Sequence, residues 1–100
     1  MSEAEDNILQ AVAKEYGVSA DVIFSKSRQR DIAEARQMAM YLIHETFGYT
    51  PERVGELFIR NRTTVIYALQ KIQDLASVDR RTQRHLNNLR SALGLAMSAK

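Results

Sequence analysis

Residues 50–76 read TPERVGELFIRNRTTVIYALQKIQDLA, and this stretch decides the fold. Thr50 followed by Pro51 and an acid is typical of a helix start, because the threonine caps the helix and proline suits its first turn. Asn61 is suited to cap a second helix, whose predicted apolar face consists of Val65, Ile66, Leu69, Ile72 and Leu75. Two short helices joined by about four residues form a helix-turn-helix, which we predict at 50–58 and 62–76.

The predicted helix pair has the side chains that a helix-turn-helix needs. Apolar residues have to brace one helix against the other, and those available are Val54, Leu57, Phe58, Val65 and Ile66. The second helix must offer short polar or basic side chains at its start, where Arg62, Thr63 and Thr64 lie. A helical hairpin in an ordinary bundle would show the same periodicity, and the glycine usual in the turn is missing. Periodicity alone therefore leaves both interpretations open.

The rest of the chain predicts further helices and no strand. Apolar spacing indicates helices at about 3–16 and 31–47, each followed by a glycine. Ser19 is suited to cap a short turn of helix, and Asp79 to cap a last helix over about 79–97. The predicted buried stripe of helix 31–47 is Ile32, Ala35, Ala39, Leu42 and Ile43, with Met38 and Phe47 at its margins. We predict an all-α fold of about six helices with a central helix-turn-helix, forming one domain over residues 1–100.

Composition excludes several classes of protein. The absence of cysteine rules out disulfides and thiolate metal sites, and His44 and His85 are too far apart in sequence to suggest a zinc pair. We expect each histidine to be a surface or boundary residue. No apolar run is long enough to cross a bilayer, and Glu3, Glu5 and Asp6 stand where a signal peptide would be basic. We therefore expect a cytoplasmic protein without a membrane partner.

Catalytic patterns are also missing from the sequence. The glycines never form the Gly-x-x-x-x-Gly-Lys-Ser/Thr loop of a nucleotide-binding site, so this chain offers no ATPase. Ser25, Ser27 and the histidines show no arrangement of nucleophile and base, and no paired carboxylates stand out. We expect no enzymatic activity, no cofactor, no metal and no small-molecule substrate.

Positive charge is segregated along the chain, although the formal net charge is only +2. No acid occurs from Leu57 to Gln73. Basic side chains gather in three groups, namely Lys26, Arg28 and Arg30, then Arg60, Arg62 and Lys71, and finally Arg80, Arg81, Arg84 and Arg90. Such segregation suits a polyanionic partner, although ordinary solvated helix faces would produce the same pattern.

Three stretches of the sequence carry a family resemblance. They are SKSRQR at 25–30, ARQMAMYL at 35–42 and TTV at 63–65. In order and spacing they resemble the C-terminal domain of DnaA, the bacterial replication initiator, and ARQMAMYL is the most specific of the three. The resemblance covers about residues 8–75. It implies a helical domain that binds a short duplex box at the replication origin.

The resemblance also implies roles for individual residues. In that family a loop arginine enters the minor groove and the helix-turn-helix reads the adjacent major groove. Arg28 stands at the position of the minor-groove arginine, and a narrow A·T-rich groove concentrates the negative potential that attracts it. Major-groove base contacts are expected from Asn61, Arg62 and Thr63. Phosphate contacts are expected from Lys26, Arg30, Gln37, Thr50, Arg60, Thr64 and Lys71. Arg36 is equally expected to contact DNA or to brace the fold through a carboxylate.

The sequence departs from the family at its recognition signature. The family typically has Phe-Gly-Gly-Arg-Asp-His-Thr-Thr-Val, whereas residues 58–65 read FIRNRTTV, one residue shorter, without glycine, and with Asn and Arg replacing Asp and His. Aspartate accepts from cytosine, whereas asparagine pairs with adenine and arginine with guanine. The methyl group of Thr63 suits thymine. We therefore predict a site that differs from the usual box in its major-groove half and keeps the A·T preference read by Arg28.

The expected partner is double-stranded DNA, bound by a monomer. The acidic lead-in after Met1 and the helix beyond the matching region favour a stand-alone protein over a fragment of a larger initiator. The last helix carries Leu86, Leu89, Leu93 and Met97, which we expect to close the bundle. The alternatives are a docking or dimer surface on that helix, as in a protein-interaction module, and a dimeric regulator similar to the Trp repressor. The molecular mass in solution separates these alternatives.

Overall fold

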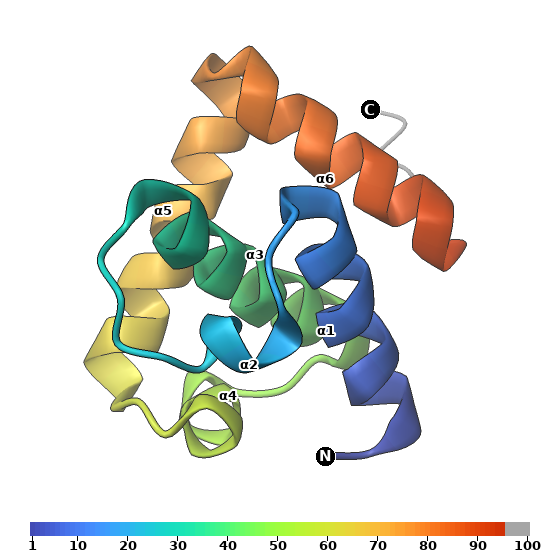
Figure 1. Cartoon of the computed structure of the whole chain (residues 1–100). Helices are drawn as coiled ribbons and strands as arrows, with labels where there is room; N and C mark the ends of the chain where they lie inside the picture. The colour runs from blue at the N-terminus through green and yellow to red at the C-terminus, as the bar shows by residue number, and fades with distance from the viewer. Residues whose placement is uncertain (96–100) are drawn as a thin grey trace.

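The computed structural model describes residues 1–95, which form six α-helices (Figure 1). The helices are α1 (Glu3–Tyr16), α2 (Ala20–Ile23), α3 (Arg30–Phe47), α4 (Pro51–Phe58), α5 (Arg62–Val78) and α6 (Arg80–Leu93). Residues 1–95 contain no strand, so the predicted all-α class is confirmed. The main differences from the predicted bounds are that α5 continues to Val78 and that α6 ends at Leu93, before a left-handed Gly94.

Short polar side chains cap five of the described helices. Four of these caps were predicted from the sequence, and Ser2, which caps α1, was not. Side-chain oxygens of Ser19, Thr50, Asn61 and Asp79 each accept a hydrogen bond from a backbone N–H two or three residues further on. Gly17 and Gly48 follow α1 and α3 with φ of 68° and 69°, a region that glycine enters without steric cost. These bounds were predictable because their signals lie within a few residues of each helix end.

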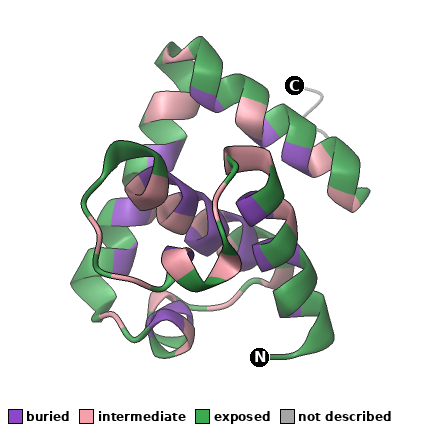
Figure 2. Ribbon diagram, viewed as in Figure 1, coloured by how far each residue is buried: buried purple, intermediate pink, exposed green. Residues whose placement is uncertain are grey.

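Helix α3 lies at the centre of the molecule. Helices α1, α2, α4 and α5 pack against it, and α6 packs across α1 and α5 (Figure 1). Figure 2 shows that the buried positions face this centre. The buried hydrophobic residues of α3 are Ala35, Met38, Ala39, Met40, Leu42 and Ile43. Met38 therefore belongs to the core and not to its margin, whereas Ile32 is only partly buried. The buried surface is wider than one stripe because four helices cover α3.

Helix α6 closes the bundle. Leu86 and Leu89 are buried, and Leu93 packs against the same core. The prediction that these leucines close the bundle is confirmed, while Met97 lies outside the described residues. The apolar face of α6 is thus already covered by its own chain.

Two buried carboxylates join helices that are far apart in sequence. Glu34 of α3 accepts hydrogen bonds from the hydroxyl groups of Tyr16 (2.7 Å) and Thr82 (3.3 Å). Burial and the hydrogen bond to Glu34 raise the pKa of Tyr16, so its phenol remains a donor. Glu5 of α1 accepts from the Tyr49 hydroxyl at 2.7 Å. Since a buried carboxylate needs such partners, these bonds fix α1 against α3, α6 and the segment before α4.

The Glu5 carboxylate makes the stability of the fold depend on pH. Hydrogen bonds from Tyr49 and from the backbone of Ser2 hold its pKa below the ordinary value, against the opposing effect of burial. The stabilisation is therefore present above the unfolded-state pKa, about 4.3 for glutamate, and is lost as the pH falls through the lower folded-state pKa. We expect Glu5→Gln to lower the free energy of unfolding at neutral pH, measured by urea titration, and this difference to shrink below about pH 4. A difference that stays constant with pH would contradict the assignment.

Candidate nucleic-acid interface

Helices α4 and α5 form the predicted helix-turn-helix, joined by residues 59–61. Val54, Phe58 and Val65 are buried, and Leu57 packs against them at the edge of the core. Ile66 does not brace the pair as predicted, since it is 41% exposed. It lies about 100° further round α5 than Val65, which turns it away from the core.

The turn passes close to α4 at Gly55. The backbone N–H of Arg60 donates to the Gly55 carbonyl at 2.9 Å, and a Cβ added at Gly55 would overlap the carbonyl oxygen of Arg60. The turn itself contains no glycine, and Ile59 takes the left-handed conformation, with φ of 55°, while remaining 85% exposed. This conformation costs about 1–2 kcal/mol in a residue with a Cβ. The glycine required for the close approach is thus in the first helix and not in the turn.

Arg60 connects the turn to the basic connector, residues 24–29. Its guanidinium donates to the carbonyl oxygens of Phe58 (2.9 Å) and Ile59 (3.3 Å), and across to the carbonyl of Ser25 (2.9 Å). The ring of Phe24 also packs on that of Phe58, with 5.4 Å between the ring centroids. The connector and the turn are therefore joined by both polar and apolar contacts.

Arg36 braces the connector from α3. Its Nε donates to the carbonyl of Ile23 at 2.8 Å and a terminal nitrogen to that of Ser27 at 3.1 Å. Of the two expected roles, the structure shows the bracing one, although the partners are backbone carbonyls and not the expected carboxylate. Burial, with a smaller effect from the charge of Arg60, lowers the pKa of Arg36. Arg28 therefore lies on a connector that two arginines hold, from α3 and from the turn.

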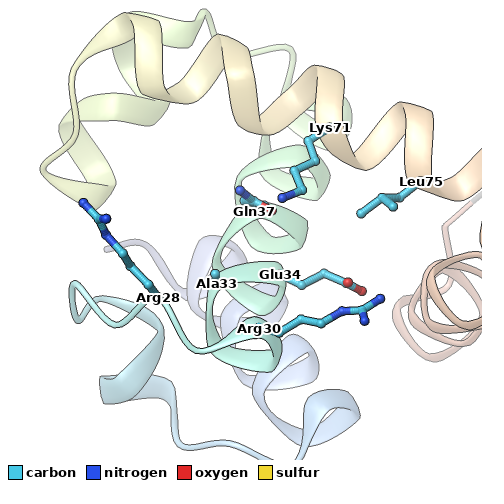
Figure 3. Close-up of a pocket in the computed structure, with 7 residues that line it drawn as sticks. All are labelled: Arg28, Arg30, Ala33, Glu34, Gln37, Lys71 and Leu75. Atoms are coloured by element: carbon cyan, nitrogen blue, oxygen red, sulfur yellow. The ribbon is translucent and has the colours of Figure 1, made fainter.

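A basic groove lies between α3 and α5 (Figure 3). Its volume is about 380 Å³, and its lining residues are Arg28, Arg30, Ala33, Glu34, Gln37, Lys71 and Leu75. Figure 3 shows Gln37 of α3 and Lys71 of α5 side by side, with Arg28 apart from them at the edge of the groove. The fold thus brings together four of the predicted contact residues from three separate segments. Lys26 and Thr50 are exposed outside this groove.

The start of α5 presents the predicted base-reading residues to solvent. Arg62, Thr63 and Thr64 are exposed, while the Oδ1 of Asn61 accepts from the backbone N–H of Thr64 at 2.8 Å. Tyr67, 60% exposed, and Gln70 continue the Thr63 face, and the Lys71 ammonium lies 5.8 Å from the centroid of the Tyr67 ring. Sequence reasoning did not include Tyr67 and Gln70. Their spacing of four and seven residues from Thr63 is the helical signal that would have identified them.

The two histidines are boundary residues, as predicted. The Nδ1 of His44 lies 2.6 Å from the carbonyl of Tyr49, and that of His85 lies 2.8 Å from a carboxylate oxygen of Glu15. Within residues 1–95, no group of three His, Cys, Asp or Glu side chains is arranged to hold a metal ion. The helices of this same part of the chain include none long and apolar enough to cross a membrane.

A helix-turn-helix beside a braced basic connector defines a class of nucleic-acid-binding domain. Comparison with known proteins identifies the family. The family model of the bacterial dnaA protein helix-turn-helix matches residues 5–72 of this sequence, and the chain belongs to this family. Membership supports DNA binding and confirms the resemblance found in the sequence.

Relatives of this chain are chromosomal replication initiator proteins DnaA. The protein of Thermus thermophilus is 38% identical over 86 residues, which are 85% of this chain and 20% of that protein. The protein of Synechocystis is 32% identical over 100 residues, covering 99% of this chain and 22% of the relative. The chain thus spans about a fifth of the length of the relatives that it matches.

Because the backbone of the turn lies close to Gly55, we expect the substitution of Gly55 by alanine to have an unusual effect on stability. In an exposed helix, replacing glycine by alanine stabilises by about 1 kcal/mol. Gly55→Ala should instead destabilise by about 1–3 kcal/mol, because the new methyl group meets the backbone of the turn. Thermal unfolding followed by circular dichroism measures this, with Asn87→Ala on the exposed face of α6 as the control for helix propensity. A rise in the melting temperature of Gly55→Ala would contradict the geometry.

Replacing Ile59 by glycine should have the opposite effect on the free energy of unfolding. Ile59→Gly relieves the left-handed strain and loses almost no buried surface, while glycine costs about 0.5–1 kcal/mol in backbone entropy. We expect a net stabilisation of up to about 1.5 kcal/mol in the same unfolding measurement. Ile59→Val keeps a branched side chain at this φ and should show no gain. Equal effects of the two substitutions would rule out backbone strain as the cause.

Proposed function

We propose that this chain binds a specific double-stranded DNA sequence, with the start of α5 in the major groove and Arg28 in the adjacent minor groove. The observation that carries this proposal is the pair of arginine braces. Arg60 ties the connector to the turn before α5, and Arg36 ties it to α3. A loop that is ordered before binding loses less conformational entropy when it enters a groove.

The exposed residues at the start of α5 support a changed major-groove preference. Arg62 is suited to guanine and the methyl group of Thr63 to thymine. Because the Oδ1 of Asn61 already accepts one hydrogen bond as the helix cap, its amide N–H groups are better placed to contact DNA. We therefore propose that Asn61 donates one hydrogen bond to a base and does not make the bidentate contact with adenine, in which the side chain both donates and accepts.

Phosphate contacts are proposed for polar and basic side chains on both sides of the groove. They are Lys26, Arg30, Gln37, Thr50, Thr64 and Lys71. Arg60 remains a predicted phosphate contact as well. Its terminal nitrogens already donate to three carbonyls, so we assign its main role to holding the connector.

The biological setting follows from the relatives, which are named as chromosomal replication initiators. We propose that this chain occupies a DnaA-like box, at a replication origin or elsewhere in the nucleoid, as a cytoplasmic monomer. The chain contains no nucleotide-binding loop, so any ATP-dependent step would need another polypeptide segment.

Selection of bound duplexes from a random pool tests this proposal, with affinities then measured against salt. We expect a motif of several base pairs with an A·T-rich flank and a steep salt dependence. Arg28→Ala should remove the A·T preference of the flank. Arg62→Ala should cost about 1–3 kcal/mol and relax discrimination at one base pair.

Arg84→Ala is the control for loss of charge, because Arg84 is exposed on α6 and does not line the basic groove. It should leave the selected motif unchanged. Equal losses on every sequence for Arg28→Ala and Arg62→Ala would show that neither residue reads bases. Failure of the wild-type protein to enrich any motif would contradict the proposed function.

A further inference from the structure

Glu52, in the first turn of α4, lies against the first residue of α5. Its Oε2 is 2.7 Å from the Nε of Arg62, and the two side chains are 59% and 61% exposed. The pair therefore joins the two helices of the motif at the surface that we propose faces DNA. An ion pair this exposed adds little to stability. A negative charge in the first turn suits the start of α4, but a carboxylate at this surface also repels phosphate groups. General affinity for DNA therefore does not account for its pair with Arg62.

We propose that Glu52 is a positioning residue that determines specificity by orienting the Arg62 guanidinium towards guanine. The inference rests on the proposed function, since it assumes that Arg62 reads a base. Nε is the inner nitrogen of the guanidinium, and a contact there leaves N–H groups of the two terminal nitrogens for the O6 and N7 of guanine.

Orientation before binding has an energetic advantage. A free arginine side chain samples many rotamers, and fixing it on DNA costs conformational entropy. In the free protein the pair with Glu52 already restricts the guanidinium to one side of α5. The preference for guanine therefore depends on a residue that does not itself touch the base.

Orientation of Arg62 by Glu52 and simple repulsion between Glu52 and DNA predict different effects when Glu52 is removed. Removing an acid near the DNA should strengthen binding to every sequence, because one repulsion is lost. Removing the orientation of Arg62 should weaken only the preference for one base pair. Glu56 supplies the matched control. It lies one turn further along α4, is exposed, and forms no ion pair with any other residue of the described chain.

The experiment measures binding by fluorescence anisotropy to two duplexes that differ only at the base pair where Arg62→Ala loses its preference. The variants are Glu52→Ala, Glu56→Ala, Arg62→Ala and the double variant Glu52→Ala with Arg62→Ala, each checked for folding by circular dichroism. Glu52→Gln replaces Glu52→Ala if the latter does not fold. We expect Glu52→Ala to lower the ratio of the two affinities about threefold to fivefold.

Three further results are expected. Glu52→Ala and Glu56→Ala should raise the affinity for non-specific duplex to a similar extent, and Glu56→Ala should leave the ratio unchanged. The double variant should have the same ratio as Arg62→Ala alone, because Glu52 acts through Arg62.

An unchanged ratio in Glu52→Ala would overturn the inference, and so would a raised one, which would mean that Glu52 masks Arg62. Additive losses in the double variant would also overturn it, because Glu52 would then read a base itself. In each of these cases a wild-type protein with a defined motif keeps the proposed function. A wild-type protein without sequence preference would contradict the proposed function instead.

Discussion

Two guanidinium groups hold the connector between α2 and α3 by its backbone carbonyls, and the geometry of the whole interface depends on these bonds. After Phe24, which packs on Phe58, residues 25–29 are polar or basic and have no apolar anchor. The bonds from Arg36 and Arg60 supply the missing constraint. The position of Arg28 is consequently linked both to the central helix of the core and to the turn of the helix-turn-helix.

The choice of carbonyl partners has an electrostatic consequence. A carboxylate bound to Arg36 or Arg60 would have neutralised its charge, whereas a carbonyl leaves that charge in place. Two close positive charges repel each other, and the charge of Arg60 contributes to the lowered pKa of Arg36. The repulsion is the cost of an arrangement that adds to the positive potential around the groove lined by Arg28, Arg30 and Lys71.

Features with local causes could be predicted from the sequence. The caps at Ser19, Thr50, Asn61 and Asp79 and the glycines after α1 and α3 set the helix bounds, because each signal acts within a few residues. The fold class and the helix-turn-helix followed from them. Burial was less predictable, since it depends on how many neighbours cover a helix. Four helices surround α3 and bury Met38, while Ile66 turns towards solvent on α5.

Contacts between distant segments could not be predicted from the sequence. The ARQMAMYL motif indicated a role for Arg36, either in binding DNA or in bracing the fold. Only the folded chain shows that Arg36 donates hydrogen bonds to the carbonyl oxygens of Ile23 and Ser27. The pair of Glu52 with Arg62 gives no sequence signal, since ten positions and a turn separate the two residues. The candidate DNA contacts were predicted from the helix-turn-helix pattern and from the family resemblance. The fold brings several of them around one groove, while their contacts with DNA remain predictions.

Asn61 carries two requirements in one side chain. It caps α5 through Oδ1, and it is also one of the residues that we propose contact a base. The side chains that cap a helix best are those of asparagine, aspartate, serine and threonine. Folding therefore favours that small set of residues at this position, whichever base they contact. A long side chain such as arginine or glutamine would lose the cap here, at a cost of about 0.5–2 kcal/mol, whereas the next residue, Arg62, does not carry this requirement.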